Sequence, residues 1–234
     1  EKSVDRFLLM SPFTFDSSMV GIFWTLCQGG TLVLPQHRVE QDIRQLVAII
    51  AEYQISHLLT LPSLYALLLE QADATQLVSL RNVILAGEEC RGDLVDRHYT
   101  RLPQAALFNE YGPTEGTVWS TAYKIPANFE GDRVPIGRPI PNMQNYIFDC
   151  HGHLAPVGVP GELCIGGIGV TSGYLNQPEL TAEKFIEHSF TAELSIYLYR
   201  TGDLARYLSD GNIEFLGRID HQVKIRGFRV ETGE

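Results

Sequence analysis

The N-terminal half of the chain alternates between short apolar runs and amphipathic segments. Apolar residues at i, i+3 and i+7, such as Ile43, Leu46 and Ile50, predict one buried face of a helix. After a first apolar run at 7–10, we expect strands over residues 31–34, 57–60, 82–86 and 105–108, and helices over 16–26, 41–53, 63–71 and 92–100. Strands that alternate with helices predict a parallel sheet covered on both faces, with ligands collecting beyond the carboxyl ends of its strands.

The pattern changes near Pro139 to short strands separated by turns. We expect strands over residues 145–149, 162–165, 205–208, 213–216 and 222–225, a helix over 178–185 capped from Gln177, and a hairpin turn at 209–212. The predicted fold class is therefore α/β. A parallel-sheet, flavodoxin-like subdomain with flanking helices over residues 1–138 is followed by a small β-barrel-like subdomain over 139–219.

A long polar loop separates the apolar run at 105–108 from a β-prone segment that begins at Val118. Its side chains are suited to a nucleotide: Tyr111 offers a flat face to a purine, and Asn109 offers a donor and an acceptor to base edges. Thr114 offers a hydroxyl group to phosphate oxygens, and Glu115 a hard oxygen ligand to Mg²⁺. Read alone, the segment is equally consistent with an ordinary loop built on a Gly-Pro turn.

Residues 109–115, which read Asn-Glu-Tyr-Gly-Pro-Thr-Glu, resemble the adenine- and magnesium-binding motif of the adenylate-forming superfamily. Four further segments are similar to motifs of the same family and follow in the same order, at residues 15–18, 161–167 with 173–175, 199–204 and 217–227. Five motifs in order, across nearly the whole chain, are specific. The sequence most resembles the amino-acid-activating adenylation domains of nonribosomal peptide synthetases.

The resemblance implies a nucleotide site. Asp203, which by itself reads as a turn residue, would hold the ribose hydroxyl groups. Phe215 stands where many relatives carry a tyrosine near the ribose, so only packing is expected there, and Arg218 would reach the ribose and phosphate region. The expected nucleotide-binding residues are Gly87, Asn109, Tyr111, Asp203, Phe215 and Arg218; the expected catalytic residues are Thr114, Glu115 and Arg218, with Glu115 as the metal ligand.

The resemblance also implies an amino-acid pocket in which Asp16 pairs with the α-ammonium group. We rank a large neutral, aromatic L-amino acid first. Trp119 would shrink the cavity towards a small side chain, and Glu110 would instead suit a second amine. The expected pocket residues are Asp16, Ser17, Val20, Thr60, Ile84, Ala86, Glu110, Val118 and Trp119.

Asp220 resembles the hinge about which the C-terminal lobe of these enzymes swings, with residues 220–234 as the hinge and the start of that lobe. Read alone, it is a solvated loop aspartate. The family's phosphate loop precedes the segment at Phe15, and the lysine that stabilises the transferring carboxylate follows the hinge. Neither is found in this sequence, so we expect a fragment that is inactive alone.

Composition narrows the class of protein further. A hydrophobic content of 44% with 20% charged residues is ordinary for a soluble globular protein. The net charge of -10 and the absence of a basic run argue against a nucleic-acid partner. No apolar stretch reaches the roughly 18 residues of a membrane span, and no leader pattern begins the chain, so we expect a cytoplasmic protein without a membrane partner.

The four cysteines lie far apart without a CxxC pair, which favours buried reduced thiols over a zinc site or a disulfide framework. Cys150, His151 and His153 flank Gly152, and this cluster favours a surface turn over metal ligation.

The leading hypothesis is ATP- and Mg²⁺-dependent activation of an amino acid as an aminoacyl-adenylate, with release of pyrophosphate. Transfer to the phosphopantetheine thiol of a carrier-protein domain would follow, which implies neighbouring synthetase domains as partners. An acyl- or aryl-CoA ligase of the same superfamily is one alternative, and Asp16 argues against it because such acids lack an ammonium group. A non-catalytic nucleotide-binding module is the other alternative.

Overall fold

The computed structural model describes residues 4–35, 39–189, 195–220, 223–225 and 228–230. The chain forms two compact units, which we describe separately. The first unit is built mainly from Glu1–Asn109 and Lys124–Val134, and the second mainly from Glu110–Tyr123 and Pro135–Ile225.

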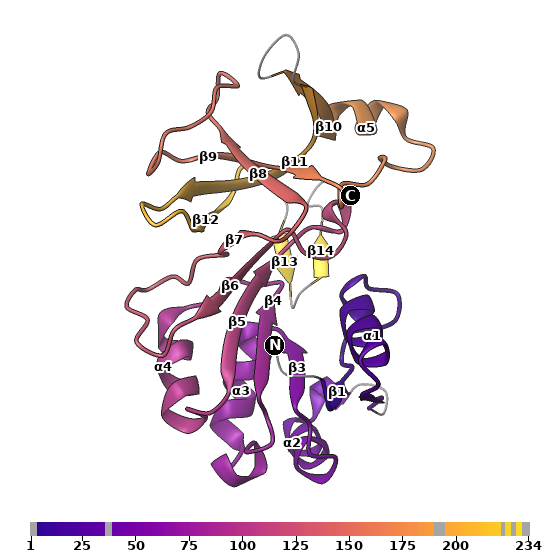
Figure 1. Ribbon diagram of the computed structural model, residues 1–234, viewed down its shortest axis with the longest axis vertical. Helices are drawn as coiled ribbons and strands as arrows, with labels where there is room; N and C mark the ends of the chain where they lie inside the picture. The colour runs from indigo at the N-terminus through magenta and orange to yellow at the C-terminus, as the bar shows by residue number, and fades with distance from the viewer. Residues whose placement is uncertain (1–3, 36–38, 190–194, 221–222, 226–227, 231–234) are drawn as a thin grey trace. The chain divides into compact units, whose positions relative to one another are not determined.

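The first unit has the predicted alternation of strands and helices (Figure 1). Its strands pair in parallel, β1 with β2, β1 with β3 and β3 with β4. Helix α2 contacts α3, and α3 contacts α4. Its elements are β1 (Arg6–Leu8), α1 (Ser17–Cys27), β2 (Thr31–Val33), η1 (Val39–Gln41), α2 (Ile43–Glu52), β3 (His57–Thr60), α3 (Pro62–Gln71), η2 (Ala74–Gln76), β4 (Asn82–Ala86), α4 (Gly92–Arg101) and the start of β5 (Ala106–Tyr111).

Burial explains why these segments form as they do. Leu46, Val47 and Ile50 form the buried face of α2, and the Asp42 carboxylate caps this helix by accepting hydrogen bonds from the backbone N–H groups of the residues two and three positions on. All four residues of β3 are buried, as expected for a strand covered on both faces. The complete sheet has the order β2-β1-β3-β4-β5-β6-β7. Its last strands are β6 (Thr121–Ile125) and the short β7 (Arg138–Pro139).

The second unit is an antiparallel sheet rather than the predicted small barrel. The strands follow the order β10-β11-β9-β8, and β12 pairs with β11, so the described strands form an open sheet. Ile147, Leu163 and Ile213 form part of its buried core. Its elements are β8 (Met143–Phe148), β9 (Gly161–Gly167), α5 (Pro178–Lys184), β10 (Phe185–Ser189), β11 (Ser195–Tyr207) and β12 (Ile213–Arg218); β13 (Val223–Ile225) and β14 (Phe228–Val230) form a separate two-stranded sheet.

Strand β11 is much longer than the predicted strand over residues 205–208. The segment Thr201-Gly202-Asp203 looks like a turn in the sequence, but Gly202 adopts a left-handed φ of 70° within a shift of register, and the strand continues through it. The predicted hairpin turn that follows is confirmed, since Gly211 N–H donates a hydrogen bond to the carbonyl of Leu208.

The polar loop lies three residues later in the chain than predicted because both flanking strands have different ends. Strand β5 continues to Tyr111, whereas β6 begins only at Thr121, because Thr117 and Val118 adopt left-handed φ angles of 57° and 74°. A 3-10 helix, η3 (Thr114–Gly116), lies between them. The loop closes tightly on Gly112, where an added Cβ atom would lie 2.2 Å from the carbonyl oxygen of Val118.

Cysteine burial was predicted correctly for two of the four residues. Cys90 and Cys164 are buried, and burial raises the pKa of each thiol to about 12. Cys27 and Cys150 are exposed, because the first ends α1 and the second lies in the turn after β8.

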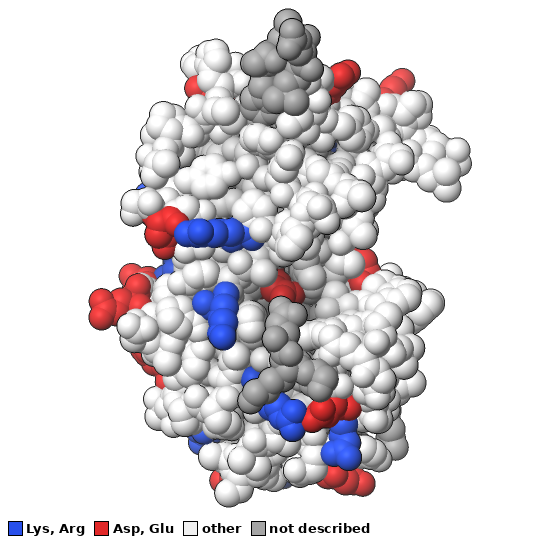
Figure 2. All heavy atoms as spheres, in the orientation of Figure 1, with Lys and Arg blue, Asp and Glu red and all other residues white. Residues whose placement is uncertain are grey.

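The structure shows how charge is distributed on one face of the molecule and what kind of helices the chain forms. On the face in view in Figure 2, the described Lys and Arg side chains are scattered among Asp and Glu without a continuous basic patch. Over the described residues, none of the helices combines the length and the apolar character needed to cross a membrane.

Candidate active site

A buried carboxylate, that of Asp203, is the centre of the site in the second unit. Asp203 on β11 pairs directly with Arg218 on β12, and Arg218 Nη1 donates a hydrogen bond of 2.7 Å to Asp203 Oδ1. The hydroxyl group of Tyr111 donates to the other oxygen, Oδ2. Asp203 is only 4% exposed, so these two donors offset the cost of burying its charge.

The irregular stretch of β11 holds this carboxylate in place. Thr201 Oγ1 donates to the carbonyl oxygen of Leu163 at 2.6 Å and accepts from the Asp203 N–H at 2.9 Å. Glycine is favoured between them, because Gly202 has a left-handed φ of 70°, and a Cβ atom there would lie 2.7 Å from Oδ2 of Asp220 and 2.8 Å from Nη2 of Arg218.

Arg218 joins the expected ribose residue to the expected hinge residue. Its Nη1 contacts Asp203, while Nε donates to Asp220 Oδ1 at 2.7 Å and Nη2 donates to Asp220 Oδ2 at 2.5 Å. The two carboxylates differ in environment, since the side chain of Asp203 is 6% exposed and that of Asp220 is 38% exposed. A single guanidinium group therefore links a buried and a half-exposed acid.

Tyr111 lies in the core of the second unit rather than in an open loop. The residue is 8% exposed, and the centroid of its ring is 6.4 Å from that of Phe215. Burial, followed by the adjacent Asp203 charge, raises the pKa of the Tyr111 hydroxyl well above its ordinary value. Tyr111 thus remains a hydrogen-bond donor at neutral pH.

Glu115 lies in η3 and is almost fully buried, with 6% of its surface exposed. The Tyr174 hydroxyl donates to Glu115 Oε1 at 2.5 Å, and the N–H of Thr171 donates to the Glu115 carbonyl oxygen at 2.9 Å. Thr114 precedes it at the start of η3 with an exposed side chain. A hydroxyl group and a fixed carboxylate therefore follow each other along the chain.

The chemistry of Glu115 fits a magnesium ion that is shared with a nucleotide. Mg²⁺ is usually bound through one or two carboxylates together with phosphate oxygens and water. Within the described ranges, no three His, Cys, Asp or Glu residues form a group that could hold a metal ion by themselves. A single carboxylate such as Glu115 matches an ion whose remaining ligands come from phosphates and water.

Several expected site residues of the first unit lie in the C-terminal parts of parallel strands or directly after them. Thr60 ends β3, and Ile84 and Ala86 lie on the adjacent β4; all three are buried. Gly87 follows β4 with a left-handed φ of 85°. Asn109 on β5 is buried and its Nδ2 donates to the Val134 carbonyl oxygen at 3.4 Å. These positions agree with ligand binding at the carboxyl ends of parallel strands.

The start of α1 carries three further expected pocket residues. Asp16 is the N-cap position, but its side chain makes no capping hydrogen bond. Ser17 Oγ donates to Ser11 Oγ at 3.0 Å, and Val20 is half-buried. The Asp16 carboxylate is therefore not engaged in stabilising the helix end.

The second unit contains the other three expected pocket residues, Glu110, Val118 and Trp119. Glu110 Oε2 and Trp119 Nε1 are buried and have no hydrogen-bond partner among the described residues. Burial raises the pKa of the Glu110 carboxyl group to about 7. Unpartnered buried polar atoms cost free energy, and polar groups on a ligand would satisfy them.

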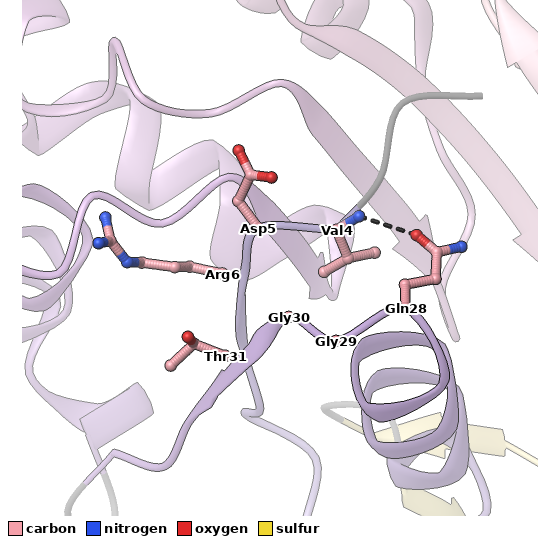
Figure 3. A pocket seen from close by; sticks show the side chains of 7 residues that line it. All are labelled: Val4, Asp5, Arg6, Gln28, Gly29, Gly30 and Thr31. Carbon is pink, nitrogen blue, oxygen red and sulfur yellow. Dashed lines mark hydrogen bonds between the residues drawn. The ribbon is translucent and has the colours of Figure 1, made fainter.

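A separate hollow in the first unit contains none of the expected site residues. It has a volume of about 490 Å³ and is lined by Val4, Asp5, Arg6, Gln28, Gly29, Gly30 and Thr31 (Figure 3). The Val4 N–H donates to Gln28 Oε1 at 2.9 Å across it.

The structure thus brings Tyr111, Asp203, Phe215, Arg218 and Asp220 into one cluster. No role for Tyr174 or Thr201 was predicted from the sequence, although both lie within matched motifs, at residues 173–175 and 199–204. Their place within those motifs was the one feature of the sequence that pointed to a role for them.

Comparison with known proteins identifies the family. The family model described as "AMP-binding enzyme" matches residues 1–175. Bacitracin synthase 3 from Bacillus licheniformis is 46% identical over 232 residues, which are 99% of this chain and 4% of that protein. The chain belongs to the AMP-binding enzyme family, as its motifs predicted, and spans a small part of the length of this relative.

Solved structures confirm the fold class. Holo-PA1221, an NRPS protein containing adenylation and PCP domains, aligns with a TM-score of 0.89 at 33% identity, over 97% of this chain and 40% of that chain. The Vibrio cholerae adenylation domain AlmE, in complex with glycyl-adenosine-5'-phosphate, aligns with a TM-score of 0.87 at 33% identity, over 99% of this chain and 43% of that chain. The mixed α/β fold, with a largely parallel sheet and a second antiparallel sheet, is that of adenylation domains.

Proposed function

We propose that this chain is part of an adenylation domain of a nonribosomal peptide synthetase. In this proposal, the carboxylate of an amino acid attacks the α-phosphate of ATP, pyrophosphate leaves, and the resulting aminoacyl-adenylate is captured by the phosphopantetheine thiol of a carrier domain. The observation that carries the proposal is the buried Asp203 carboxylate held between Tyr111 and Arg218 in a member of the AMP-binding enzyme family.

The proposed roles follow from the contacts of each residue. Asp203 accepts hydrogen bonds from the ribose hydroxyl groups, and the Arg218 guanidinium pairs with it while adding positive charge near the phosphates. Thr114 offers its hydroxyl group to a phosphate oxygen. Catalysis of this kind depends on positioning and on charge stabilisation rather than on a protein nucleophile.

Glu115 is proposed to hold Mg²⁺ together with the nucleotide phosphates. When bound, the ion supplies positive charge that screens the triphosphate and stabilises the pyrophosphate leaving group. The burial of Glu115 and its fixed orientation support this role.

An amino acid is the proposed substrate. The glycyl-adenosine-5'-phosphate bound to AlmE, a protein 33% identical to this chain, supports an aminoacyl group. Asp16 would pair with the α-ammonium group, and its lack of a capping contact leaves its carboxylate available at the helix start. A fatty or aryl acid has no such group, so a CoA ligase explains Asp16 less well.

The second half-reaction implies partners. PA1221 contains a PCP domain beside its adenylation domain, which supports a carrier domain and neighbouring synthetase domains as partners of this chain. The location that we propose for this chain is the cytoplasm. Asp220, the proposed hinge residue, would let one site serve both half-reactions by domain movement.

Amino-acid-dependent exchange of pyrophosphate into ATP, measured with the full-length protein and all proteinogenic amino acids, tests the proposal. We expect a clear maximum for one large neutral amino acid, with weaker exchange for close neighbours, because a hydrophobic pocket separates them by roughly 1–3 kcal/mol per methylene. Binding of an aminoacyl-adenylate analogue without exchange for any amino acid would instead indicate a non-catalytic nucleotide-binding module.

A further inference from the structure

We propose that Tyr174 is a positioning residue that fixes the carboxylate of Glu115 for the magnesium nucleotide. The inference rests on the proposed function, because it takes the metal role of Glu115 from there. Its direct basis is the hydrogen bond of 2.5 Å from the Tyr174 hydroxyl to Glu115 Oε1, which joins residues 59 positions apart.

Tyr174 is itself held by contacts with two residues, Thr181 and Phe185. Its N–H donates to Thr181 Oγ1 at 2.9 Å, and its ring meets the ring of Phe185 edge-on, with centroids 5.5 Å apart. Gly173 allows this approach, since its φ is 127° and an added Cβ atom would lie 2.3 Å from Thr181 Cγ2. The hydroxyl group therefore reaches Glu115 from a side chain anchored on α5 and β10.

The segment Gly169–Tyr174 also holds the backbone of the Glu115 loop. The Thr171 N–H donates to the carbonyl oxygen of Glu115 at 2.9 Å, and Thr117 Oγ1 donates to the carbonyl oxygen of Gly169 at 2.5 Å. Three hydrogen bonds thus connect two stretches that are distant in sequence. They act on the loop in which Thr117 and Val118 adopt left-handed φ angles, a conformation that persists in residues other than glycine only where surrounding contacts hold it.

A phenol that donates to one carboxylate oxygen restricts the rotation of the carboxylate. Groups that orient a metal ligand in this way typically contribute 10–100-fold to metal affinity or activity. Loss of the Tyr174 hydroxyl should therefore weaken the response to magnesium without altering the parts of the site that recognise the amino acid or the adenosine.

The test is the Tyr174→Phe variant of the full-length protein. We expect the Mg²⁺ concentration for half-maximal pyrophosphate exchange to rise about tenfold, with an unchanged KM for the amino acid. Binding of Mn²⁺ together with α,β-methylene-ATP, followed by electron paramagnetic resonance, should weaken by a similar factor. Binding of an aminoacyl-sulfamoyl adenosine, which needs no metal, should stay the same.

Two further variants separate the possible outcomes. Tyr146→Phe is the matched control, because it also removes a hydroxyl hydrogen bond in the second unit, to Gln144 Oε1, and should leave all four measurements unchanged. If Glu115→Gln raises the Mg²⁺ requirement but Tyr174→Phe does not, the positioning role of Tyr174 is wrong and the proposed function stands. If neither variant changes it, the metal role of Glu115 in the proposed function is wrong as well.

Discussion

The hydroxyl group of Tyr111 donates a hydrogen bond to Oδ2 of Asp203, although the two residues are 92 positions apart in the sequence. They belong to separate motifs that were each expected to contact adenosine. Arg218 occupies Oδ1 of the same carboxylate. We therefore expect a ribose bound to Asp203 to share these contacts or replace them, which would make adenosine binding depend on all three side chains.

Removing the Tyr111 hydroxyl should weaken both the fold and the nucleotide site. We expect Tyr111→Phe to cost about 1–3 kcal/mol in the free energy of unfolding, because it takes a donor from a buried carboxylate. The KM for ATP should rise, as steady-state exchange assays can measure. Tyr99→Phe is the control: it removes a hydroxyl hydrogen bond of 2.6 Å to the Ile125 carbonyl oxygen in the first unit, and it should leave the KM for ATP unchanged.

Asp220 should matter more for thioester formation than for adenylation. Proline fixes φ at the residue where the hinge must turn, so Asp220→Pro should keep much of the pyrophosphate exchange and impair loading of the carrier domain. Single-turnover loading of carrier protein, compared with exchange in the same preparation, measures the split. Equal losses in both half-reactions would contradict the hinge role.

Substitution of Asp16 should impair recognition of the amino acid and leave ATP binding unchanged. Asp16→Ala removes the proposed partner of the ammonium group, and loss of one member of such a pair costs about 2–5 kcal/mol. We therefore expect kcat/KM for the preferred amino acid to fall at least thirtyfold, while the affinity for ATP alone, measured by calorimetry, stays the same. A variant that kept its amino-acid response would remove the main argument against a CoA ligase.

Glu110 should make stability depend on pH near neutrality. Its pKa of about 7 lies above the ordinary value of 4.5, so the folded protein favours the protonated carboxyl group. This contribution to stability is fully present below pH 4.5 and is lost as the pH rises through about 7. Unfolding of the wild type and Glu110→Gln at several pH values should therefore show a difference that changes by a few kcal/mol across this window. A difference that is constant with pH would show that Glu110 is ionised in the fold.

His57 should make stability depend on pH in the opposite direction from Glu110, with stability lost as the pH falls. Burial, and then the charge of Arg81, lower the pKa of His57 from 6.5 to about 4. Its Nδ1 lies 2.8 Å from Ser56 Oγ and its Nε2 lies 2.7 Å from Asn82 Nδ2, so the neutral ring fits with Nε2 as an acceptor.

The stability contributed by neutral His57 is present above pH 6.5 and is lost as the pH falls through about 4. Acid unfolding of the wild type should therefore begin at a higher pH than that of His57→Gln, as circular dichroism can follow. Coincident acid transitions would contradict this.

The alternation of strands and helices in the first unit could be predicted because burial imposes it on the sequence. Strands β3 and β4 have the predicted bounds, since both are continuous buried runs. The end of β5 could not be predicted in this way. Residues 109–111 are polar or aromatic like a loop, yet they remain in the strand.

Irregular backbone limited the predictions for the second unit. Gly202 marks a register shift inside one strand, not the turn that its neighbours indicate. The contact between Tyr174 and Glu115 depends on how two loops fold together, and no local pattern encodes it. Only motif order, carried by the family resemblance, pointed to these segments at all.

The most direct test of the central claim is an experimental structure of the full-length protein, or of its complete adenylation domain, with a non-hydrolysable aminoacyl-adenylate. The account predicts both ribose hydroxyl groups within hydrogen-bonding distance of the Asp203 carboxylate and the substrate ammonium group on Asp16. Adenosine bound away from Asp203, with the contacts of Tyr111 and Arg218 unchanged, would contradict it.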